Sequence, residues 1–212
     1  DRAKAAEAAG AKVIGGEVAP EGAWPWQVAL LVGGAPVGVD SQFCGGSLVL
    51  DRWVLTAAHC IHMEMEDGSF ADLAPTDIAV LAGTNHLTPG AGDLIPVEAI
   101  FRHPSYVGTE CDFDIALIKL SRAPSVPYQT IEVPDAEYGD LLNQQGVTTI
   151  VTGWGLQEGA AMTADLRQAE IQVLDRELCN SAMMEARAEE AASGFGYAVQ
   201  TLGVGEDDAY AI

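Results

Sequence analysis

Basic residues are scarce in this sequence. Lysine and arginine together number 10 in 212 residues, against 31 aspartates and glutamates, and the formal net charge at pH 7 is −21. A surface so poor in positive charge cannot neutralise a phosphate backbone, which argues against nucleic acid as a partner. We interpret the acidity as a source of solubility rather than as a docking surface for a cationic partner.

A long apolar run and a secretion signal are also missing. No stretch approaches the roughly 18 uninterrupted apolar residues of a membrane-spanning helix, so we expect no membrane partner. The chain starts at Asp1, without an initiator methionine and without the apolar segment of a secretory signal peptide. Either a signal has already been removed or the sequence is a segment of a longer one.

The sequence does contain a series of short β-type runs, separated by turns rich in glycine and proline. Such a series is typical of an antiparallel barrel, and the 49% of hydrophobic residues suffice for a sizeable core. The first six runs are Gln27–Val32, Phe43–Leu50, Trp53–Thr56, Ile78–Leu81, Leu94–Arg102 and Ala116–Leu120. Two later runs, Val147–Gly155 and Leu166–Val173, predict the beginning of a second barrel.

A histidine follows one of these runs in a position that suits a catalytic base. The apolar run Trp53-Val54-Leu55 leads into Thr56-Ala57-Ala58-His59-Cys60, so a buried strand delivers His59 to a short turn. A general base must be held within hydrogen-bond reach of a nucleophile and oriented by a third group. The alternative is a satisfied core histidine, which the specific context of Cys44-Gly45-Gly46-Ser47 and Cys60 disfavours.

A carboxylate precedes another of these runs. In Cys111-Asp112-Phe113-Asp114-Ile115-Ala116-Leu117, Asp114 comes directly before an alternating apolar strand. Its side chain then stands at the strand's entry, where a carboxylate can be part buried and aimed at a neighbouring ring. An ordinary turn residue is the alternative for Asp114. We interpret Asp112, two residues earlier, as a solvated loop acid.

These segments resemble those of a known family. The string from Phe43 to Cys60 resembles the histidine-loop signature of the trypsin/chymotrypsin-like serine proteases. Asp114 with the Ile-Ala-Leu run after it, and Thr152-Gly153-Trp154-Gly155, resemble later motifs in the family's order. The resemblance implies an all-β fold, a chymotrypsin-like double antiparallel β-barrel whose second barrel is incomplete, with a helix near the C-terminus.

The activity implied by the resemblance is peptide-bond hydrolysis by acyl transfer. His59 would be the general base and then the general acid. Asp114 would accept the Nδ1 proton of His59 and so hold the tautomer that leaves Nε2 free. The implied partner is a protein or peptide substrate, and no cofactor is implied.

The resemblance divides the chain into four parts. These are a leader or activation peptide at 1–12, an N-terminal barrel at 13–122, an inter-barrel linker at 123–146 and a partial C-terminal barrel at 147–212. The last part contains a helical insertion, because Arg176–Ala192 is dense in alanine, glutamate, methionine and arginine and Asp175 can cap its start.

The start of the second part resembles the family's activation junction. In Lys12-Val13-Ile14-Gly15-Gly16, cleavage after Lys12 would free Val13 as a new amino terminus, so the chain would be a zymogen. An ordinary Gly-Gly turn after a linker is the alternative.

The resemblance also implies a disulfide between Cys44 and Cys60. Such a bond would place the protein in an oxidising compartment, secreted or periplasmic. Closing that short loop contributes on the order of 3 kcal/mol.

Cys179 resembles a cysteine that pairs with one further along the family's chain. Cys111 has no obvious counterpart, and it could pair with Cys179, pair with a cysteine in the missing part or stay free.

The nucleophile of the family is missing. The family carries its serine in a Gly-Asp-Ser-Gly-Gly stretch, and this sequence contains none; we interpret Ser193, the nearest imitation, as a cap or turn residue. One hypothesis is a protease fragment, completed by a second chain or a missing C-terminal segment. The other is a catalytically inactive homologue that acts as a binding or regulatory module. We favour the fragment and expect the 212-residue chain alone to be inactive.

Two further features have weaker functional interpretations. The acidic segment Ile61–Thr76 is interpreted as a solvated surface loop, although family loops in this place border the substrate cleft, where acidity would favour basic peptides.

Cys44, His59, Cys60 and His62 are potential metal ligands, but their spacing fits no usual zinc pattern. We therefore expect no metal site.

Overall fold

The computed structural model describes residues 16–65, 68–108, 112–155, 162–175, 177 and 181. The described residues fall into two compact units, one within Asp1–Val133 and Ile150–Glu170, the other within Pro134–Thr149 and Ile171–Ile212. The predicted leader at 1–12 lies outside the described residues, as does all of the predicted helix Arg176–Ala192 apart from residues 177 and 181.

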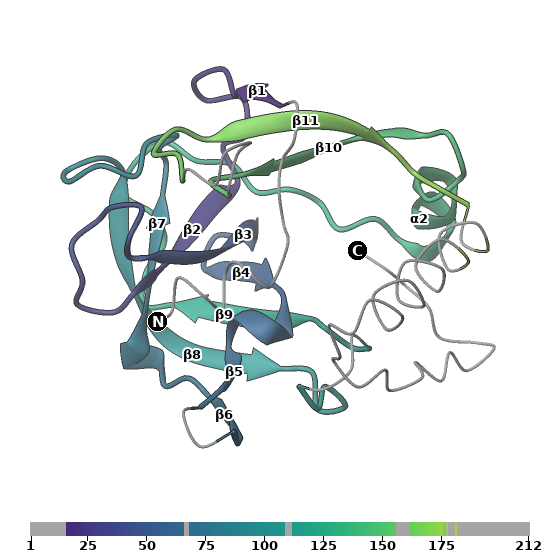
Figure 1. Cartoon of the computed structure of the whole chain (residues 1–212). Coiled ribbons are helices and arrows are strands. Elements are labelled where there is room, and N and C mark those ends of the chain that lie inside the picture. Colours follow the sequence, from purple (N-terminus) through teal and green to yellow (C-terminus); the bar gives the residue numbers. More distant parts are fainter. Residues whose placement is uncertain are drawn as a thin grey trace, which may run out of the picture. The chain divides into compact units, whose positions relative to one another are not determined.

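Six strands of the first unit close into an antiparallel barrel (Figure 1). Around the barrel the order is β2 (Gln27–Val32), β3 (Gln42–Leu50), β4 (Trp53–Thr56), β9 (Ala116–Leu120), β8 (Asp93–Arg102) and β7 (Ile78–Ala82). The six runs predicted from the sequence are confirmed as these strands, with bounds that differ by at most one residue. The prediction succeeds because each run is rich in residues that favour strands and is bounded by turn residues. Buried and less buried side chains alternate along β4, β9 and the first part of β8.

Strand β2 is covered on both faces. Val28 and Leu30 belong to the cluster that fills the barrel, whereas Ala29 and Leu31 pack in a second cluster that includes Trp154. All four of these β2 residues are fully buried. A strand without a solvent face is apolar at consecutive positions, which explains the near-continuous apolar run in this part of the sequence.

Much of the segment interpreted as a surface loop forms a hairpin. Strands β5 (His62–Glu64) and β6 (Phe70–Asp72) pair in a two-stranded sheet, with His62 opposite Asp72. A 3₁₀ helix, η2 (Pro75–Asp77), follows. These two strands were not predicted because the segment is acidic and contains methionine, whereas β-propensity scales favour branched and aromatic residues.

The remaining strands form a three-stranded sheet in the order β1 (Glu17–Val18), β11 (Arg167–Gln172), β10 (Thr148–Gly153). The two runs predicted to begin a second barrel are thus confirmed as strands, and in the described part of the chain their sheet is not closed. Helix α2 (Ala136–Leu142) lies within the predicted linker, and its N-cap Asp135 accepts a 2.8 Å hydrogen bond from the N–H of Tyr138. Among the described residues, no helix has the length and apolar character needed to cross a bilayer.

Candidate active site

His59 lies just after β4, in a short 3₁₀ helix, η1 (Ala58–Cys60). The end of β4 is anchored, because the hydroxyl of Thr56 donates a 2.8 Å hydrogen bond to the carbonyl oxygen of Gly45 on β3. Ala58 is fully buried, while the side chain of His59 is 60% exposed. The turn therefore places Ala58 in the core and leaves the imidazole of His59 accessible. A general base must be accessible, because it has to contact the substrate.

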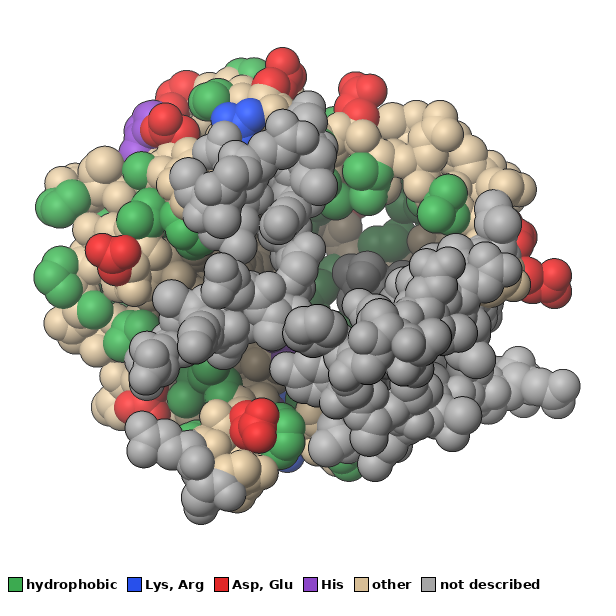
Figure 2. All heavy atoms as spheres, in the orientation of Figure 1, with side chains coloured by type: hydrophobic (Ala, Val, Ile, Leu, Met, Phe, Trp, Pro, Cys, Tyr) green, Lys and Arg blue, Asp and Glu red, His purple; other side chains and the backbone are tan. Residues whose placement is uncertain are grey.

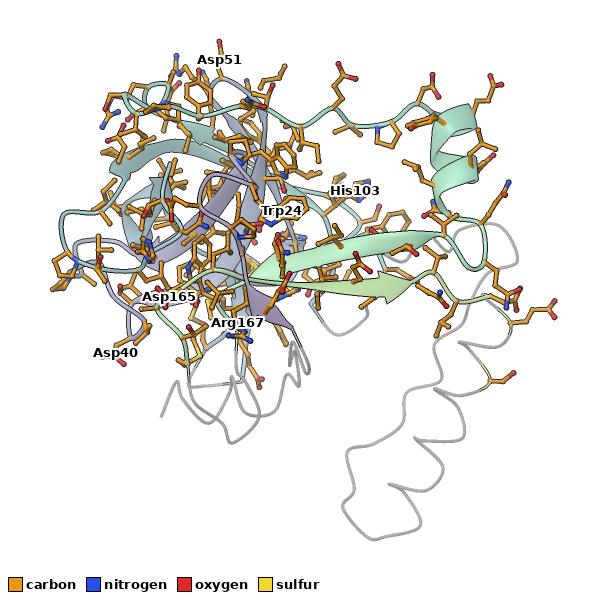
Figure 3. The ribbon with its side chains drawn as sticks, turned by 90° about the horizontal axis from the view of Figure 1, so that it is seen from above. Trp24, Asp40, Asp51, His103, Asp165 and Arg167 are labelled. Carbon is orange, nitrogen blue, oxygen red and sulfur yellow. A yellow bond between two sulfur atoms is a disulfide. The ribbon has the colours of Figure 1, made fainter. Side chains whose placement is uncertain are left out.

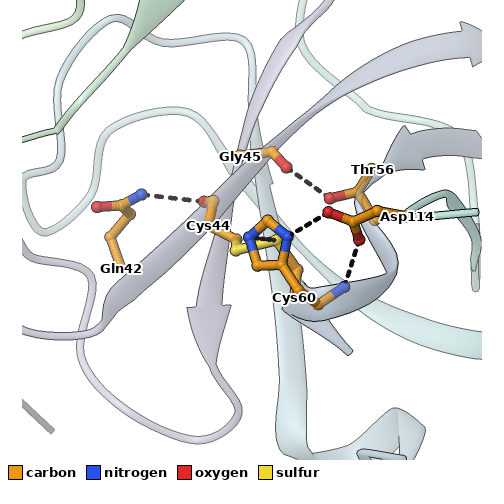
Figure 4. Close-up of a disulfide and its surroundings, with 7 residues drawn as sticks. Gln42, Cys44, Gly45, Thr56, Cys60 and Asp114 are labelled. Atoms are coloured by element: carbon orange, nitrogen blue, oxygen red, sulfur yellow. Dashed lines mark hydrogen bonds and ion pairs between the residues drawn. A yellow bond between two sulfur atoms is a disulfide. The ribbon is translucent and has the colours of Figure 1, made fainter. Parts of the chain in front are cut away.

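A disulfide between Cys44 and Cys60 ties this turn to β3 (Figure 4). The predicted pairing is therefore confirmed, with the two Cα atoms 6.0 Å apart, an ordinary separation for a disulfide. The closed loop contains β4 and His59, so the cross-link restrains the segment that carries the imidazole.

The disulfide also bears on the metal hypothesis. Cys44, His59 and Cys60 present ligand atoms that lie within 4.8 Å of one another. Cysteine binds zinc as a thiolate, and both sulfurs are already bonded to each other. The cluster in this state therefore offers only the imidazole to a metal.

Asp114 holds His59 at two points (Figure 4). Its Oδ2 lies 2.7 Å from Nδ1 of the imidazole, and its Oδ1 accepts a 2.7 Å hydrogen bond from the backbone N–H of His59. The pairing of β4 with β9 explains how these residues meet, since Thr56 lies opposite Ala116. His59 follows the end of β4 and Asp114 precedes the start of β9. The two residues therefore lie close together although 55 positions separate them in the sequence.

This arrangement selects one state of the ring. With a carboxylate at Nδ1, the ring proton sits on Nδ1 and Nε2 keeps its lone pair. The Sγ of Cys60 lies 3.6 Å from Nε2, but a disulfide sulfur has no proton to donate, so the lone pair remains available. The pair can accept a proton at Nε2 while the carboxylate stabilises the resulting imidazolium, which is the chemistry of a general base.

A second histidine, His62, has a different environment. Its side chain is 12% exposed, and its Nδ1 lies 2.5 Å from Oδ1 of Asp72. The ring stacks on Phe70 and meets Tyr106 edge-on, with ring centroids 5.6 and 5.8 Å apart respectively. Burial would raise the pKa of the Asp72 carboxyl, but hydrogen bonds from His62 and Arg102 outweigh burial and lower it. We interpret this cluster as the structural anchor of the β5–β6 hairpin.

Some of the other candidate residues are described by the structure and some are not. Lys12, Val13, Cys111, Cys179 and Ser193 lie outside the described residues. Asp112 is exposed, whereas the nearby Asp114 side chain is 29% exposed and turned toward His59. The second contact of Asp114, to the backbone N–H of His59, has no signal in the sequence because it depends on the turn geometry.

Comparisons with known proteins identify the family of this chain. A model of the family described as Trypsin matches residues 13–201. The chain belongs to the trypsin family. Transmembrane protease serine 9 of Rattus norvegicus is 34% identical over 169 residues, a match that covers 79% of this chain and 14% of that protein. The chain thus spans a small part of the length of this relative.

Membership of the trypsin family accounts for the architecture. The closed six-stranded barrel and the further sheet are those of a chymotrypsin-like all-β fold. The family is one of serine proteases, so its substrates are proteins. In this trypsin-family chain, the residues that resemble the family's histidine and aspartate motifs are the pair that the fold brings together.

Proposed function

We propose that this trypsin-family chain works in a serine endopeptidase, with His59 as the general base and Asp114 as the residue that orients it. The observation that carries the proposal is the pair of contacts between Asp114 and His59. One carboxylate oxygen lies 2.7 Å from Nδ1 and the other accepts a 2.7 Å hydrogen bond from the backbone N–H. Two contacts restrain both the position and the rotation of the ring. Such restraint matters because misplacement by about 1 Å can cost about 10² in rate.

The proposed reaction uses the free Nε2 of His59. Nε2 takes the proton of a serine hydroxyl as the serine oxygen bonds to the scissile carbonyl carbon, and the Asp114 carboxylate stabilises the imidazolium. Nε2 then gives this proton to the leaving amine as the C–N bond breaks. Water attacks the acyl-enzyme by the same sequence of proton transfers, which restores the serine and the neutral ring.

The serine itself is proposed to come from sequence outside these 212 residues, since they contain no Gly-Asp-Ser-Gly-Gly stretch. A second chain or a further segment of the same protein would supply it, and the 212-residue chain alone would be inactive. The same missing stretch favours a second candidate function. In that case the protein is a catalytically inactive homologue that acts as a binding or regulatory module.

Activation by cleavage between Lys12 and Val13 belongs to the same proposal. It is supported by the family match, which begins at residue 13. The Cys44–Cys60 disulfide supports an extracellular or periplasmic location, because disulfides persist in oxidising compartments. Mass spectrometry of fully active protein should find Val13 at the amino terminus, and an intact Lys12–Val13 bond would contradict this step.

Replacing Asp114 tests the orienting role. In the protein expressed from the full reading frame, Asp114→Asn should lower kcat for a peptide amide by about 10⁴, because an amide neither stabilises the imidazolium nor holds the correct tautomer. Asp112→Asn is the matched control, since it makes the same chemical change at an exposed acid two residues away, and it should behave like the wild type. A loss of less than about tenfold for Asp114→Asn would remove the assignment.

Labelling with a fluorophosphonate separates the two candidate functions. This reagent phosphonylates an activated serine, so the full-length protease should be labelled and its His59→Ala variant should not. Absence of labelling in the wild-type protein from the full reading frame would favour the inactive homologue.

A further inference from the structure

The backbone bends unusually at the residue before Asp114. Phe113 has a φ of 57°, and among the residues that the structure describes it is the one residue other than glycine with a positive φ. In this left-handed region an L-residue pays roughly 1–2 kcal/mol, because Cβ approaches the following carbonyl oxygen. Such a conformation persists only where the surroundings enforce it.

A ring stack is the contact that can enforce it. The ring of Phe113 lies almost parallel to the imidazole of His103, with 4.7 Å between centroids and 7° between planes. Phe113 is 44% exposed, so burial in the core does not account for its position. His103, labelled in Figure 3, follows the end of β8 and is itself oriented, because its Nδ1 accepts a 3.2 Å hydrogen bond from the N–H of Ser105.

Two backbone hydrogen bonds connect this stack to Asp114. The N–H of Ile115 donates to the carbonyl oxygen of Phe113 at 2.7 Å, which closes a three-residue turn centred on Asp114. The N–H of His103 donates to the carbonyl oxygen of Ile115 at 3.0 Å. The residues on both sides of Asp114 are thus fixed to the segment after β8, one through its ring and the other through its backbone.

We propose that His103 and Phe113 are positioning residues for the His59–Asp114 pair. The stack holds the turn, and the turn aims both oxygens of Asp114 at His59. Without the stack, Phe113 relaxes to a negative φ, which rotates the peptide before Asp114 and takes the carboxylate away from one of its two donors. This inference rests on the proposed function, and it adds two residues that touch neither substrate nor reacting atoms.

Nitrogen-15 NMR of the His59 ring tests the inference on the 212-residue chain itself, without a nucleophile. At a pH where the ring is neutral, the two ring shifts distinguish the Nδ1–H from the Nε2–H tautomer. The wild type should show Nδ1–H, and Asp114→Asn gives the reference spectrum for a lost acceptor. His103→Ala should shift the ring toward Nε2–H, and His103→Phe, which keeps an aromatic partner for Phe113, should restore the wild-type tautomer.

A change at Phe113 provides a second, independent variant. Phe113→Val should also lose the Nδ1–H tautomer, because a β-branched residue disfavours positive φ and has no ring to stack. The matched control is Phe101→Ala on β8, which likewise removes a half-exposed aromatic ring, in this case one that lies 5.6 Å from the ring of Trp53. If His103→Ala lowers the unfolding midpoint but leaves the wild-type tautomer, the stack is only structural and the inference is wrong.

Kinetics of the complete protease keep this inference separate from the proposed function. His103→Ala should lower kcat by about 10- to 100-fold with little change in KM, and His103→Phe should recover most of the loss. An inactive complete wild-type protein with a stack-dependent tautomer would overturn the proposed function and support the positioning role. An active protein in which His103→Ala changes neither the His59 tautomer nor kcat would support the proposed function and overturn the positioning role.

Discussion

At the scale of single residues, Asp93 shows how one carboxylate can join two segments. Its side chain is 10% exposed and accepts hydrogen bonds from both terminal nitrogens of Arg122, at 2.6 and 2.7 Å. It also accepts from the N–H and the hydroxyl of Ser125, at 2.7 and 2.8 Å. The hydrogen bonds from Arg122, with those from Ser125, outweigh burial and hold the pKa of the Asp93 carboxyl well below its usual range.

Asp93→Asn should therefore destabilise the fold, by about 1–2 kcal/mol, because a charged acceptor is lost while the half-exposed Arg122 stays hydrated. Since the folded pKa lies below the unfolded one, this stabilisation is present above about pH 4 and is lost as the pH falls further. Urea unfolding should show a difference from wild type that is constant near neutral pH and shrinks in acid. Asp40→Asn, at an exposed acid, is the control. A difference that persists unchanged in acid would contradict the argument.

His86 leads to the opposite dependence on pH. Its Nδ1 lies 2.8 Å from Oδ1 of Asp165, labelled in Figure 3, and its Nε2 lies 3.2 Å from Oε2 of Glu21. The hydrogen bond with Asp165, and after it the charge of Glu21, raises the pKa of His86 despite some burial. A raised folded pKa means that the charged ring stabilises the fold fully below about pH 6.5 and loses this effect as the pH rises through the folded value.

His86→Gln should consequently lower Tm more at about pH 5.5 than at about pH 8.5. Comparing each variant with wild type at the same pH removes the contribution of the other titrating groups. Equal losses of Tm at the two pH values would show that the charge on His86 does not contribute to stability.

At the scale of strands, Gly45 and Gly46 differ although they are neighbours on β3. A Cβ on Gly46 would lie 2.6 Å from Cγ1 of Val54 and 2.8 Å from the carbonyl oxygen of Leu55, both on β4. A Cβ on Gly45 would lie 3.2 Å from Nε2 of Gln27, the end of a flexible side chain. The second glycine therefore permits the close approach of β3 to the strand that leads to His59.

Gly46→Ala should destabilise the protein by about 1–3 kcal/mol, as expected when an atom is added against a buried side chain and a backbone oxygen. Gly45→Ala is the matched control and should cost clearly less, because Gln27 can shift. Urea unfolding of the two variants measures the difference. Equal effects would mean that β3 can move away from β4 without cost.

The same strands show how far sequence could lead. The barrel strands are predictable because β-type runs and the turn residues that bound them are local signals. The segments of His59, Asp114 and the Cys44–Cys60 pair are predictable through short motifs that resemble those of the family. The stack of His103 on Phe113 is not predictable, since nothing about a phenylalanine indicates a positive φ. The β5–β6 hairpin was missed because distant residues hold it: Arg102 bonds to Asp72, 30 positions earlier, and Tyr106 meets the ring of His62, 44 positions earlier.

At the scale of the whole molecule, the acidic residues outnumber the basic ones by 31 to 10. Figure 2 shows acidic side chains scattered over the visible face and few basic ones. Of the five lysines and arginines in the described part of the chain, four form ion pairs with acids: Arg52, Arg102, Lys119 and Arg122. Ten basic residues cannot balance 31 acidic ones, and the net charge of −21 means that self-repulsion opposes the compact state.

Added salt should therefore stabilise the protein at neutral pH. Sodium chloride at about 0.1 M reduces the screening length to about 10 Å, which weakens repulsion between distant surface acids while leaving short ion pairs largely intact. Tm should rise as salt is added up to about 0.2 M, below the concentrations at which salts act through hydration. Replacing the exposed Glu132 and Asp140 by lysine should raise Tm at low salt and flatten the salt dependence. If Tm is independent of salt in both proteins, the acidic surface serves solubility without a cost in stability.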